Sequence, residues 1–220
     1  MPSLLVTGAN RGIGREIVRQ CAADGWDVIG ACRNPAEAGL DCETMALDVA
    51  DAGSVETLAE TLGDRPIDLL WNNAGIYPDK GLGLDQLDYG DWLAAMNVNV
   101  LAPIRLASRL RQNVAASDKK LMAFTSSVMA SIGRDPSGAY AYRSSKAALN
   151  MAVTCLKPDV RPLGIACALI HPGWVRTDMG GGEADIDVED SVAGMRRVLN
   201  GFTMDQSGQF LSYDGSTFPW

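Results

Sequence analysis

The chain is poor in the residues that build metal centres: it has one histidine, His171, and five cysteines. The number of cysteines is odd and none stands in a C-x-x-C pair, which argues against both a disulfide framework and a zinc site. All five cysteines lie in or beside apolar segments, where we expect buried, hydrophobic roles. A single histidine also gives little support to a histidine-based catalytic triad. We therefore expect no bound metal.

Long apolar runs are missing as well. No stretch approaches the roughly 18 residues of a membrane-spanning helix, and the start of the chain has no basic segment typical of a signal peptide. We therefore expect a cytoplasmic protein without membrane contact. Positive charge is in deficit, because 19 Lys and Arg stand against 27 Asp and Glu, for a net charge of −8. This balance disfavours non-specific binding to nucleic acid.

What the chain has in abundance is apolar sequence, at 47% of its 220 residues, which fits one α/β domain over residues 1–220. Short apolar runs predict strands at Ser3–Thr7, Trp26–Cys32, Thr44–Leu47, Ile67–Trp71, Lys120–Thr125, Ile165–Ile170 and Phe210–Leu211. Helical spacing predicts helices at Arg15–Ala23, Val55–Leu62, Trp92–Leu110, Tyr140–Leu156 and about Glu189–Leu199. Alternation of strands and helices predicts a single doubly wound parallel sheet of about seven strands, with helices on both faces.

A glycine-rich turn, Gly8-Ala9-Asn10-Arg11-Gly12-Ile13-Gly14, joins the first predicted strand to the first predicted helix. Glycines let the backbone approach a pyrophosphate, and a helix N-terminus offers it free N–H groups. The spacing is Gly-x-x-x-Gly-x-Gly rather than the common dinucleotide pattern, and no Lys-Ser/Thr follows, so it is not a P-loop. The turn predicts a dinucleotide site.

The end of the second strand indicates which dinucleotide. Proteins that prefer NAD place Asp or Glu about 20 residues beyond the glycines, to bind the ribose 2′-hydroxyl. This chain has Arg33 there, and a guanidinium suits a 2′-phosphate. Arg11 in the glycine turn adds a second cation. We predict NADP(H) as the cofactor.

Tyr142 and Lys146 lie one turn apart on a predicted helix, on the same face. A cation beside a phenol lowers its pKa. Moving that pKa from ~10 to ~7 takes about 4 kcal/mol, and one charge at ~4 Å with an effective dielectric of ~20 supplies about that much. We therefore expect Lys146 to lower the pKa of Tyr142 and make it a general acid/base.

Further polar groups follow predicted strands, at the sheet edge where ligands bind in this class. Asn72-Asn73-Ala74-Gly75 follows the fourth strand and Ser126-Ser127 follows the fifth. Asn97 and Asn99 fall inside a predicted helix, where asparagine is mildly unfavourable. We expect one of these two asparagines to have a function.

These segments together resemble the short-chain dehydrogenase/reductase family over nearly the whole chain. The matching motifs, in the family's order, are Thr7-Gly8-x-x-x-Gly12-Ile13-Gly14, Asn72-Asn73-Ala74-Gly75, Ser126-Ser127, Tyr142-x-x-x-Lys146 and Pro172-Gly173. Within the family, Tyr-Arg-Ser-Ser-Lys and the closing Tyr213-Asp214-Gly215-Ser216 resemble C-factor and sniffer-like carbonyl reductases. The resemblance implies NADPH-dependent reduction of a small carbonyl compound, an aldehyde, ketone or quinone, to an alcohol.

The resemblance also implies roles for individual residues. Tyr142 exchanges a proton with the substrate oxygen, and Lys146 lowers its pKa and binds the nicotinamide ribose. Ser127 holds the substrate oxygen, and Asn99, rather than Asn97, holds a water that relays protons to Lys146. Cofactor contacts are implied at Gly8, Asn10, Arg11, Gly12, Ile13, Gly14, Arg33, Asp48, Val49, Asn73, Ala74, Gly75, Tyr142, Lys146, Pro172, Val175 and Thr177. An open substrate pocket is expected near Tyr77, Ile132, Tyr140, Trp174 and Met179.

Two other functions are compatible with the same pattern. One is an NAD-linked alcohol dehydrogenase working in the oxidative direction, against which Arg33 argues. The other is an NADP-binding signalling or regulatory protein of C-factor type, in which turnover is incidental. We also expect a homo-oligomer, a dimer or tetramer, and the resemblance implies that the two long helices Trp92–Leu110 and Tyr140–Leu156 pair between subunits.

Overall fold

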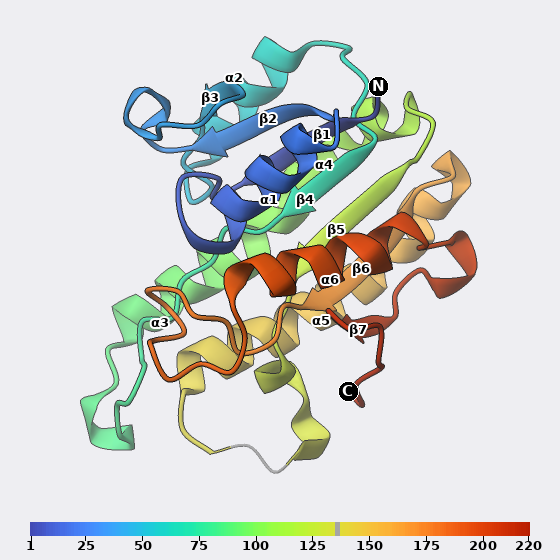
Figure 1. Ribbon diagram of the computed structural model, residues 1–220. Helices are drawn as coiled ribbons and strands as arrows, with labels where there is room; N and C mark the ends of the chain where they lie inside the picture. Colours follow the sequence, from blue (N-terminus) through green and yellow to red (C-terminus); the bar gives the residue numbers. More distant parts are fainter. Residues whose placement is uncertain (135–136) are drawn as a thin grey trace.

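A parallel sheet forms the centre of the computed structural model, which describes residues 1–134 and 137–220. The order of its seven strands is β3-β2-β1-β4-β5-β6-β7. Their bounds are β1 Ser3–Thr7, β2 Asp27–Cys32, β3 Glu43–Ala46, β4 Leu69–Asn72, β5 Leu121–Thr125, β6 Ala166–His171 and β7 Phe210–Ser212. β1 pairs in parallel with both β2 and β4, so the strand order reverses between β1 and β4 (Figure 1). The predicted doubly wound sheet is confirmed, and ligands bind at such a reversal in this class of fold.

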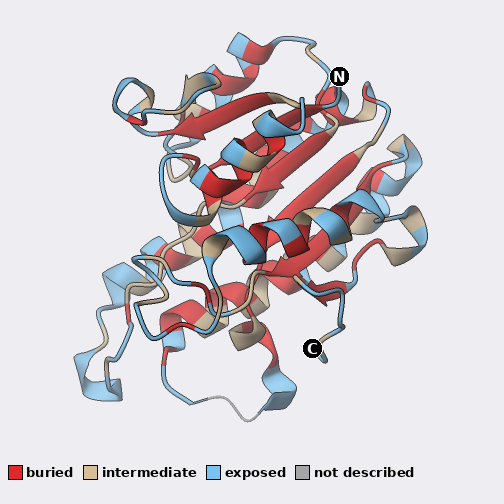
Figure 2. Ribbon diagram, in the orientation of Figure 1, coloured by how far each residue is buried: buried red, intermediate tan, exposed pale blue. Residues whose placement is uncertain are grey.

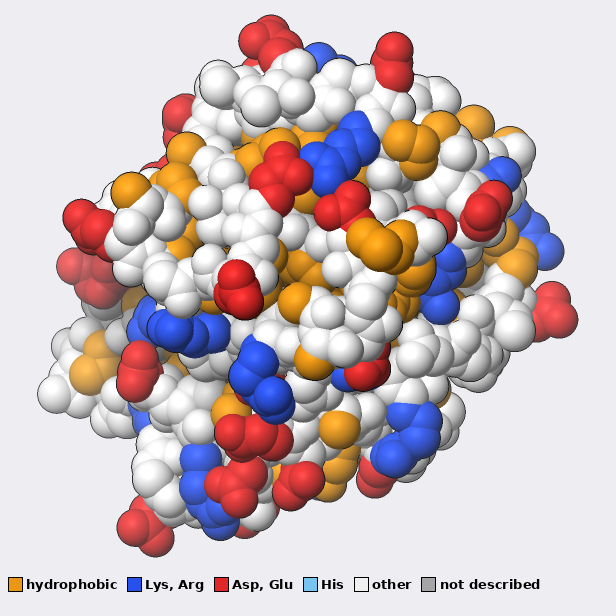
Figure 3. All heavy atoms as spheres, turned by 45° about the horizontal axis from the view of Figure 1, so that its top comes forward, with side chains coloured by type: hydrophobic (Ala, Val, Ile, Leu, Met, Phe, Trp, Pro, Cys, Tyr) orange, Lys and Arg blue, Asp and Glu red, His pale blue; other side chains and the backbone are white. Residues whose placement is uncertain are grey.

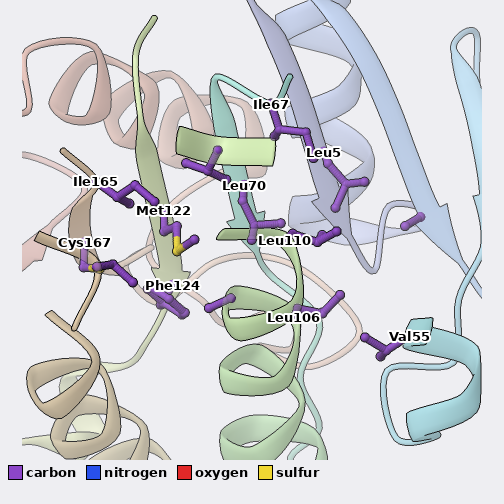
Figure 4. Packing of buried hydrophobic residues seen from close by; sticks show 14 of the residues in the cluster. Leu5, Val55, Ile67, Leu70, Leu106, Leu110, Met122, Phe124, Ile165 and Cys167 are labelled. Carbon is purple, nitrogen blue, oxygen red and sulfur yellow. The ribbon is translucent and has the colours of Figure 1, made fainter. Parts of the chain in front are cut away.

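Helices cover both faces of the sheet. α1 (Gly12–Ala23) and α6 (Val188–Asn200) lie in front of it in Figure 1, and α2 (Ala52–Leu62), α4 (Ala102–Ala115) and α5 (Tyr140–Val160) lie behind. Side chains of each strand alternate between the two layers: Leu4 and Val6 pack with α1 and α6, and Leu5 packs with the other three helices. Figure 2 shows the consequence, with the strands other than the edge strand β3 almost entirely buried and the helices exposed along their outer sides. Leu110 of α4 belongs to the same apolar cluster as Leu70 of β4 (Figure 4).

The long helix expected over Trp92–Leu110 forms, but it is not regular, because a π-helical turn interrupts its α-helical bonding. α3 spans Tyr89–Met96, a widened π-helical turn spans Asn97–Leu101, and α4 begins at Ala102. Pro103 has no N–H to donate to the carbonyl of Asn99, four residues earlier, so regular α-helical bonding fails here. Such π-bulges are frequent at functional sites, and this one carries Asn99.

Other helices extend beyond their predicted bounds, among them α2, which begins at Ala52 instead of Val55. α1 begins at Gly12 instead of Arg15, so the glycine turn itself forms the helix's first turn. α5 continues past Leu156 to Val160, with Pro158 inside it. The remaining predicted elements lie within a few residues of their expected positions.

The surface carries charges of both signs. Figure 3 shows acidic and basic side chains interspersed over one face instead of gathered into one patch. None of the described helices is both long and apolar enough to cross a membrane. Among residues 1–134 and 137–220, no cluster of His, Cys, Asp or Glu has the makings of a metal site.

Candidate active site

A cleft of about 270 Å³ opens at the carboxyl edge of the sheet, where the segments after the first six strands, β1 to β6, meet. Most predicted cofactor-binding residues line it: Gly8, Asn10, Arg11, Gly12, Ile13, Gly14, Arg33, Asp48, Val49, Asn73, Ala74, Gly75, Tyr142, Lys146, Pro172 and Thr177. Val175 lies outside the lining, because it is buried and its backbone forms a bridge with Ile186.

The glycine turn forms one wall of this cleft, in a conformation that needs glycine. Gly8 and Gly12 have φ values of +67° and +50°, in the left-handed region. A Cβ on Gly14 would lie 2.1 Å from the carbonyl oxygen of Gly8. Arg11, the N-cap residue of α1, makes no side-chain capping bond. The first N–H groups of α1 therefore lack a side-chain cap, an arrangement suited to binding a pyrophosphate.

The two arginines predicted to bind the 2′-phosphate differ in their partners. Arg33 is exposed at the end of β2 and forms no ion pair within the described residues. Arg11 donates to the carboxylate of Asp178 across the cleft, with Nη1 and Oδ2 3.1 Å apart. Arg33 is thus open to an anion, and Arg11 is shared with an acid that sequence reasoning missed. The only sign of Asp178 in the sequence is its position directly after Thr177.

Tyr142 and Lys146 lie on the first two turns of α5, both buried. Burial raises the pKa of Tyr142 to about 12, although the nearby Ser127 hydroxyl lowers it. The Lys146 ammonium lies 5.9 Å from the centre of the Tyr142 ring and donates to the carbonyl oxygen of Thr125 at 2.8 Å. Burial lowers the pKa of Lys146 itself to about 8.

The expectation that Lys146 lowers the pKa of Tyr142 is therefore wrong for this structure. The estimate assumed a cation about 4 Å from the phenol and a dielectric of ~20, whereas here loss of hydration of the phenolate dominates. The correction has a chemical consequence. With a pKa of about 12, Tyr142 is protonated at neutral pH, as a proton donor has to be.

The two serines after β5 have different surroundings. The Ser127 hydroxyl lies near enough to the Tyr142 phenol to lower its pKa, and it accepts from the backbone N–H of Met129 at 3.1 Å. Ser126 donates its hydroxyl proton to Asn150 Oδ1 at 2.6 Å, inside the protein. The structure thus brings Ser127, and not the Ser126 hydroxyl, to Tyr142.

Asn99 in the π-helical turn is completely buried beside Lys146. Its side chain accepts from the N–H of Ile76 and donates to the carbonyl of Ile76 and to Ser145 Oγ, each at 2.9 Å. A Cβ on Gly75 would lie 3.2 Å from Asn99 Oδ1 and 3.5 Å from Lys146 Nζ, so both side chains lie close to Gly75. The Asn99 side chain fixes the loop after β4, and the implied water relay stays a prediction. Asn97 instead donates to the carbonyl of Ala50, at 3.0 Å.

The residues predicted for the substrate pocket fall into two groups. Tyr77 stacks on Tyr142, with ring centres 4.2 Å apart, and Met179 lines the cleft. Tyr140, Trp174 and Ile132 are 39%, 49% and 73% exposed and lie outside the lining of the cleft.

Several lining residues were not predicted: Cys32, Leu47, Ile76, Val98, Thr125, Ser126 and Asp178. Most border a predicted motif, which is the one signal that the sequence carries for them. Thr7 was also missed as an organiser of the site. Its hydroxyl oxygen accepts from the N–H groups of Asn73 and Ala74, both at 3.0 Å, and so holds the loop after β4 against β1.

Comparisons with known proteins agree with this geometry. The family model described as short chain dehydrogenase matches residues 3–185. The C-signal protein of Myxococcus xanthus is 43% identical over 158 residues, covering 70% of this chain and 93% of that protein. The NADPH-bound carbonyl reductase from chicken fatty liver superposes with a TM-score of 0.91 at 32% identity, covering 100% of this chain and 99% of that one. The carbonyl reductase Sniffer of D. melanogaster superposes with a TM-score of 0.91 at 30% identity, over 100% of both chains.

Proposed function

Because the chain belongs to the short-chain dehydrogenase family, we propose that it is an NADPH-dependent oxidoreductase that reduces an aldehyde, ketone or quinone to an alcohol. The observation that carries this proposal is geometric: the buried Tyr142 lines the cleft, with the Lys146 ammonium 5.9 Å from its ring centre and Ser127 beside it. Arg33 supports NADP(H) as the cofactor, since it is open to a 2′-phosphate. The NADPH-bound carbonyl reductase of similar structure supports the same choice.

When bound, NADPH supplies the hydride that reduces the carbonyl carbon. The glycine turn and the N-terminus of α1 hold the pyrophosphate. The Ser127 hydroxyl orients the substrate oxygen, and Tyr142 donates its proton to that oxygen as negative charge develops there. Lys146 places a positive charge near the phenolate that remains. Its pKa of about 8 keeps most of it charged at neutral pH.

Arg33 argues against the NAD-linked alcohol dehydrogenase, because proteins that prefer NAD place an acid at this position to bind the ribose 2′-hydroxyl.

A second function is favoured by one specific observation, the 43% identity with a protein named C-signal. In that case the chain is an NADP-binding signalling or regulatory protein, and turnover is incidental. The Tyr142→Phe variant separates the two functions in cells. A signalling protein retains its cellular effect without turnover, and an enzyme loses both.

The proposed activity is tested by following NADPH oxidation with a panel of aldehydes, ketones, ketoesters and quinones, menadione among them. We expect Tyr142→Phe to lose on the order of 10²–10⁴-fold in kcat, because it removes the proton donor. Cofactor binding, measured by fluorescence titration, should persist because the ring remains. Turnover of Tyr142→Phe at the unmodified rate would contradict the proposal.

The cofactor assignment is tested by Arg33→Asp. We expect its affinity for NADPH to fall by about tenfold or more, through loss of attraction and added repulsion, with little change for NADH. Comparing the KM values of the two cofactors in both proteins measures this. Equal use of NADPH and NADH by the unmodified protein would refute the assignment.

We also propose a homodimer or homotetramer and a cytoplasmic location. Leu93, Leu101 and Met151 are exposed apolar residues on α3, the π-helical turn and α5, which supports pairing through these helices. Light scattering on the purified protein measures the assembly. Five free cysteines support a reducing compartment.

A further inference from the structure

A buried carboxylate without a cationic partner lies in the loop between β4 and α3. Asp79 is 3% exposed and forms no salt bridge within the described residues. Glu16 on α1 is the other buried acid among the described residues, and it is paired with Arg19. A buried carboxylate is costly unless hydrogen bonds compensate for its lost hydration. The partners of Asp79 therefore indicate why it is there.

Both oxygens of Asp79 accept from the first turn of α5. Oδ2 accepts from the N–H of Ala141 at 2.7 Å, and Oδ1 accepts from the N–H of Tyr142 at 3.2 Å. The N-cap residue of α5, Ala139, has no capping side chain and a φ of +50°. Asp79 thus caps this helix from a distant loop, and its charge is stabilised by the helix dipole. One of the two groups that it binds is the backbone of the proposed proton donor.

Neighbouring residues of the same loop also reach the active site. The Tyr77 ring stacks on the Tyr142 ring at 4.2 Å. Lys80 Nζ donates to the carbonyl oxygens of Met179 and Gly180, at 2.9 and 3.3 Å. The loop therefore contacts Tyr142 through both its ring and its backbone N–H. It also binds the segment Met179–Gly180 beside the cleft through Lys80.

We propose that Asp79 is a positioning residue, whose carboxylate fixes the first turn of α5 so that the Tyr142 hydroxyl stays aligned with the substrate oxygen. This inference rests on the proposed function, because it takes Tyr142 as the proton donor. Small displacements of a reacting group matter, since an error of about 1 Å can cost on the order of 10²-fold in rate.

The test is Asp79→Asn, which keeps the size of the side chain and replaces one acceptor oxygen with an NH₂ group. With NADPH and the best carbonyl compound of the panel, menadione by default, we expect kcat to fall by about tenfold. The KM for NADPH should stay within about twofold, because Asp79 is not among the residues that line the cleft.

Asp88 provides a matched control. It caps α3, accepting from the N–H groups of Gly90 and Asp91 at 2.7 and 3.2 Å, the same two distances as at Asp79. α3 carries no residue of the proposed proton-transfer machinery. Asp88→Asn should therefore leave kcat within about twofold, whatever it does to stability.

A double-mutant cycle separates positioning from general loss of structure. If Asp79 acts through the Tyr142 hydroxyl, Asp79→Asn should not further reduce the residual turnover of Tyr142→Phe. A purely structural role would lower turnover in both backgrounds by the same factor. The single variant Tyr142→Phe tests the proposed function by itself. A failure of the proposed function can therefore be told apart from a failure of the positioning role of Asp79.

A second variant, Asp79→Ser, guards against a poorly folded Asn variant, and circular dichroism with NADPH titration checks both. The proposal is overturned if a folded variant keeps kcat, or if kcat and NADPH affinity fall together. It is also overturned if both variants fail to fold, since Asp79 would then serve the fold alone.

Discussion

α1 and α5 both begin at the edge of the cleft, and they start in opposite ways. The first turn of α1 lacks a side-chain cap and follows a turn of glycines. The first turn of α5 also lacks a local cap, yet it receives the Asp79 carboxylate from a distant loop. A helix N-terminus favours negative charge in both cases. At the N-terminus of α1 the negative charge is expected from a ligand, whereas at the N-terminus of α5 it comes from the protein's own Asp79.

The difference divides the cleft into two regions: the α1 region, formed by the glycine turn with Arg11 and Arg33, and the α5 region around Tyr142 and Lys146. The α1 region has exposed arginines and open N–H groups, which suit a charged cofactor that enters and leaves. The α5 region is buried, and the Asp79 carboxylate holds its first turn, which suits a proton donor that has to keep one position. Rigid support around the reacting groups and a more open region for the cofactor both fit the proposed reaction.

Breaking the α1 region should have the largest effect. In Gly14→Ala the new Cβ would lie 2.1 Å from the carbonyl oxygen of Gly8, so the turn has to move. We expect affinity for NADPH to fall on the order of 100-fold, about 2.7 kcal/mol. Fluorescence titration measures it.

Gly53→Ala is the matched control, because Gly53 lies in the first turn of α2, where a Cβ would be 3.5 Å from the nearest atom, an ordinary contact. Its NADPH affinity should not change. If Gly14→Ala bound NADPH as tightly as the unmodified protein, the turn would not be the pyrophosphate site.

The α5 region can be probed through its buried ammonium. Burial lowers the pKa of Lys146 from 10.5 to about 8, so between these pH values the unfolded chain binds more protons than the folded one. Stability contributed by this group therefore rises with pH across that window. We expect the unmodified protein to gain about 2 kcal/mol relative to Lys146→Met between pH 8 and pH 10, measured by urea unfolding. A difference independent of pH would show that Lys146 keeps its ordinary pKa in the folded state.

The smallest expected effect concerns the Arg11–Asp178 pair, which joins the α1 region to the segment after β6. Asp178→Asn frees Arg11 for a phosphate, and we expect affinity for NADPH to rise about two- to fivefold at low salt and little at high salt. Asp187→Asn is the control, since it opens a similar exposed pair with Arg176 outside the cleft. An equal rise of NADPH affinity in both variants would mean that the change in net charge, and not the release of Arg11, causes it.

Much of the α1 region could be predicted from the sequence. The strand, glycine turn and helix are consecutive, and the arginine that indicates NADP(H) ends the next strand. Tyr142 and Lys146 were found for the same reason, because a spacing of four residues in a helix is a local property. The π-helical turn at Asn99 escaped prediction, although Pro103 gave a local hint of it.

The sequence by itself determined the order of strands and helices, the glycine turn and the facing of Tyr142 and Lys146, because each depends on residues close together in the chain. Only the tertiary structure decided that Asp79 caps α5 across 62 residues. It also decided that the pKa of Tyr142 is raised instead of lowered. Hydration is lost through packing by the whole fold, and no spacing between two residues encodes how much water surrounds them.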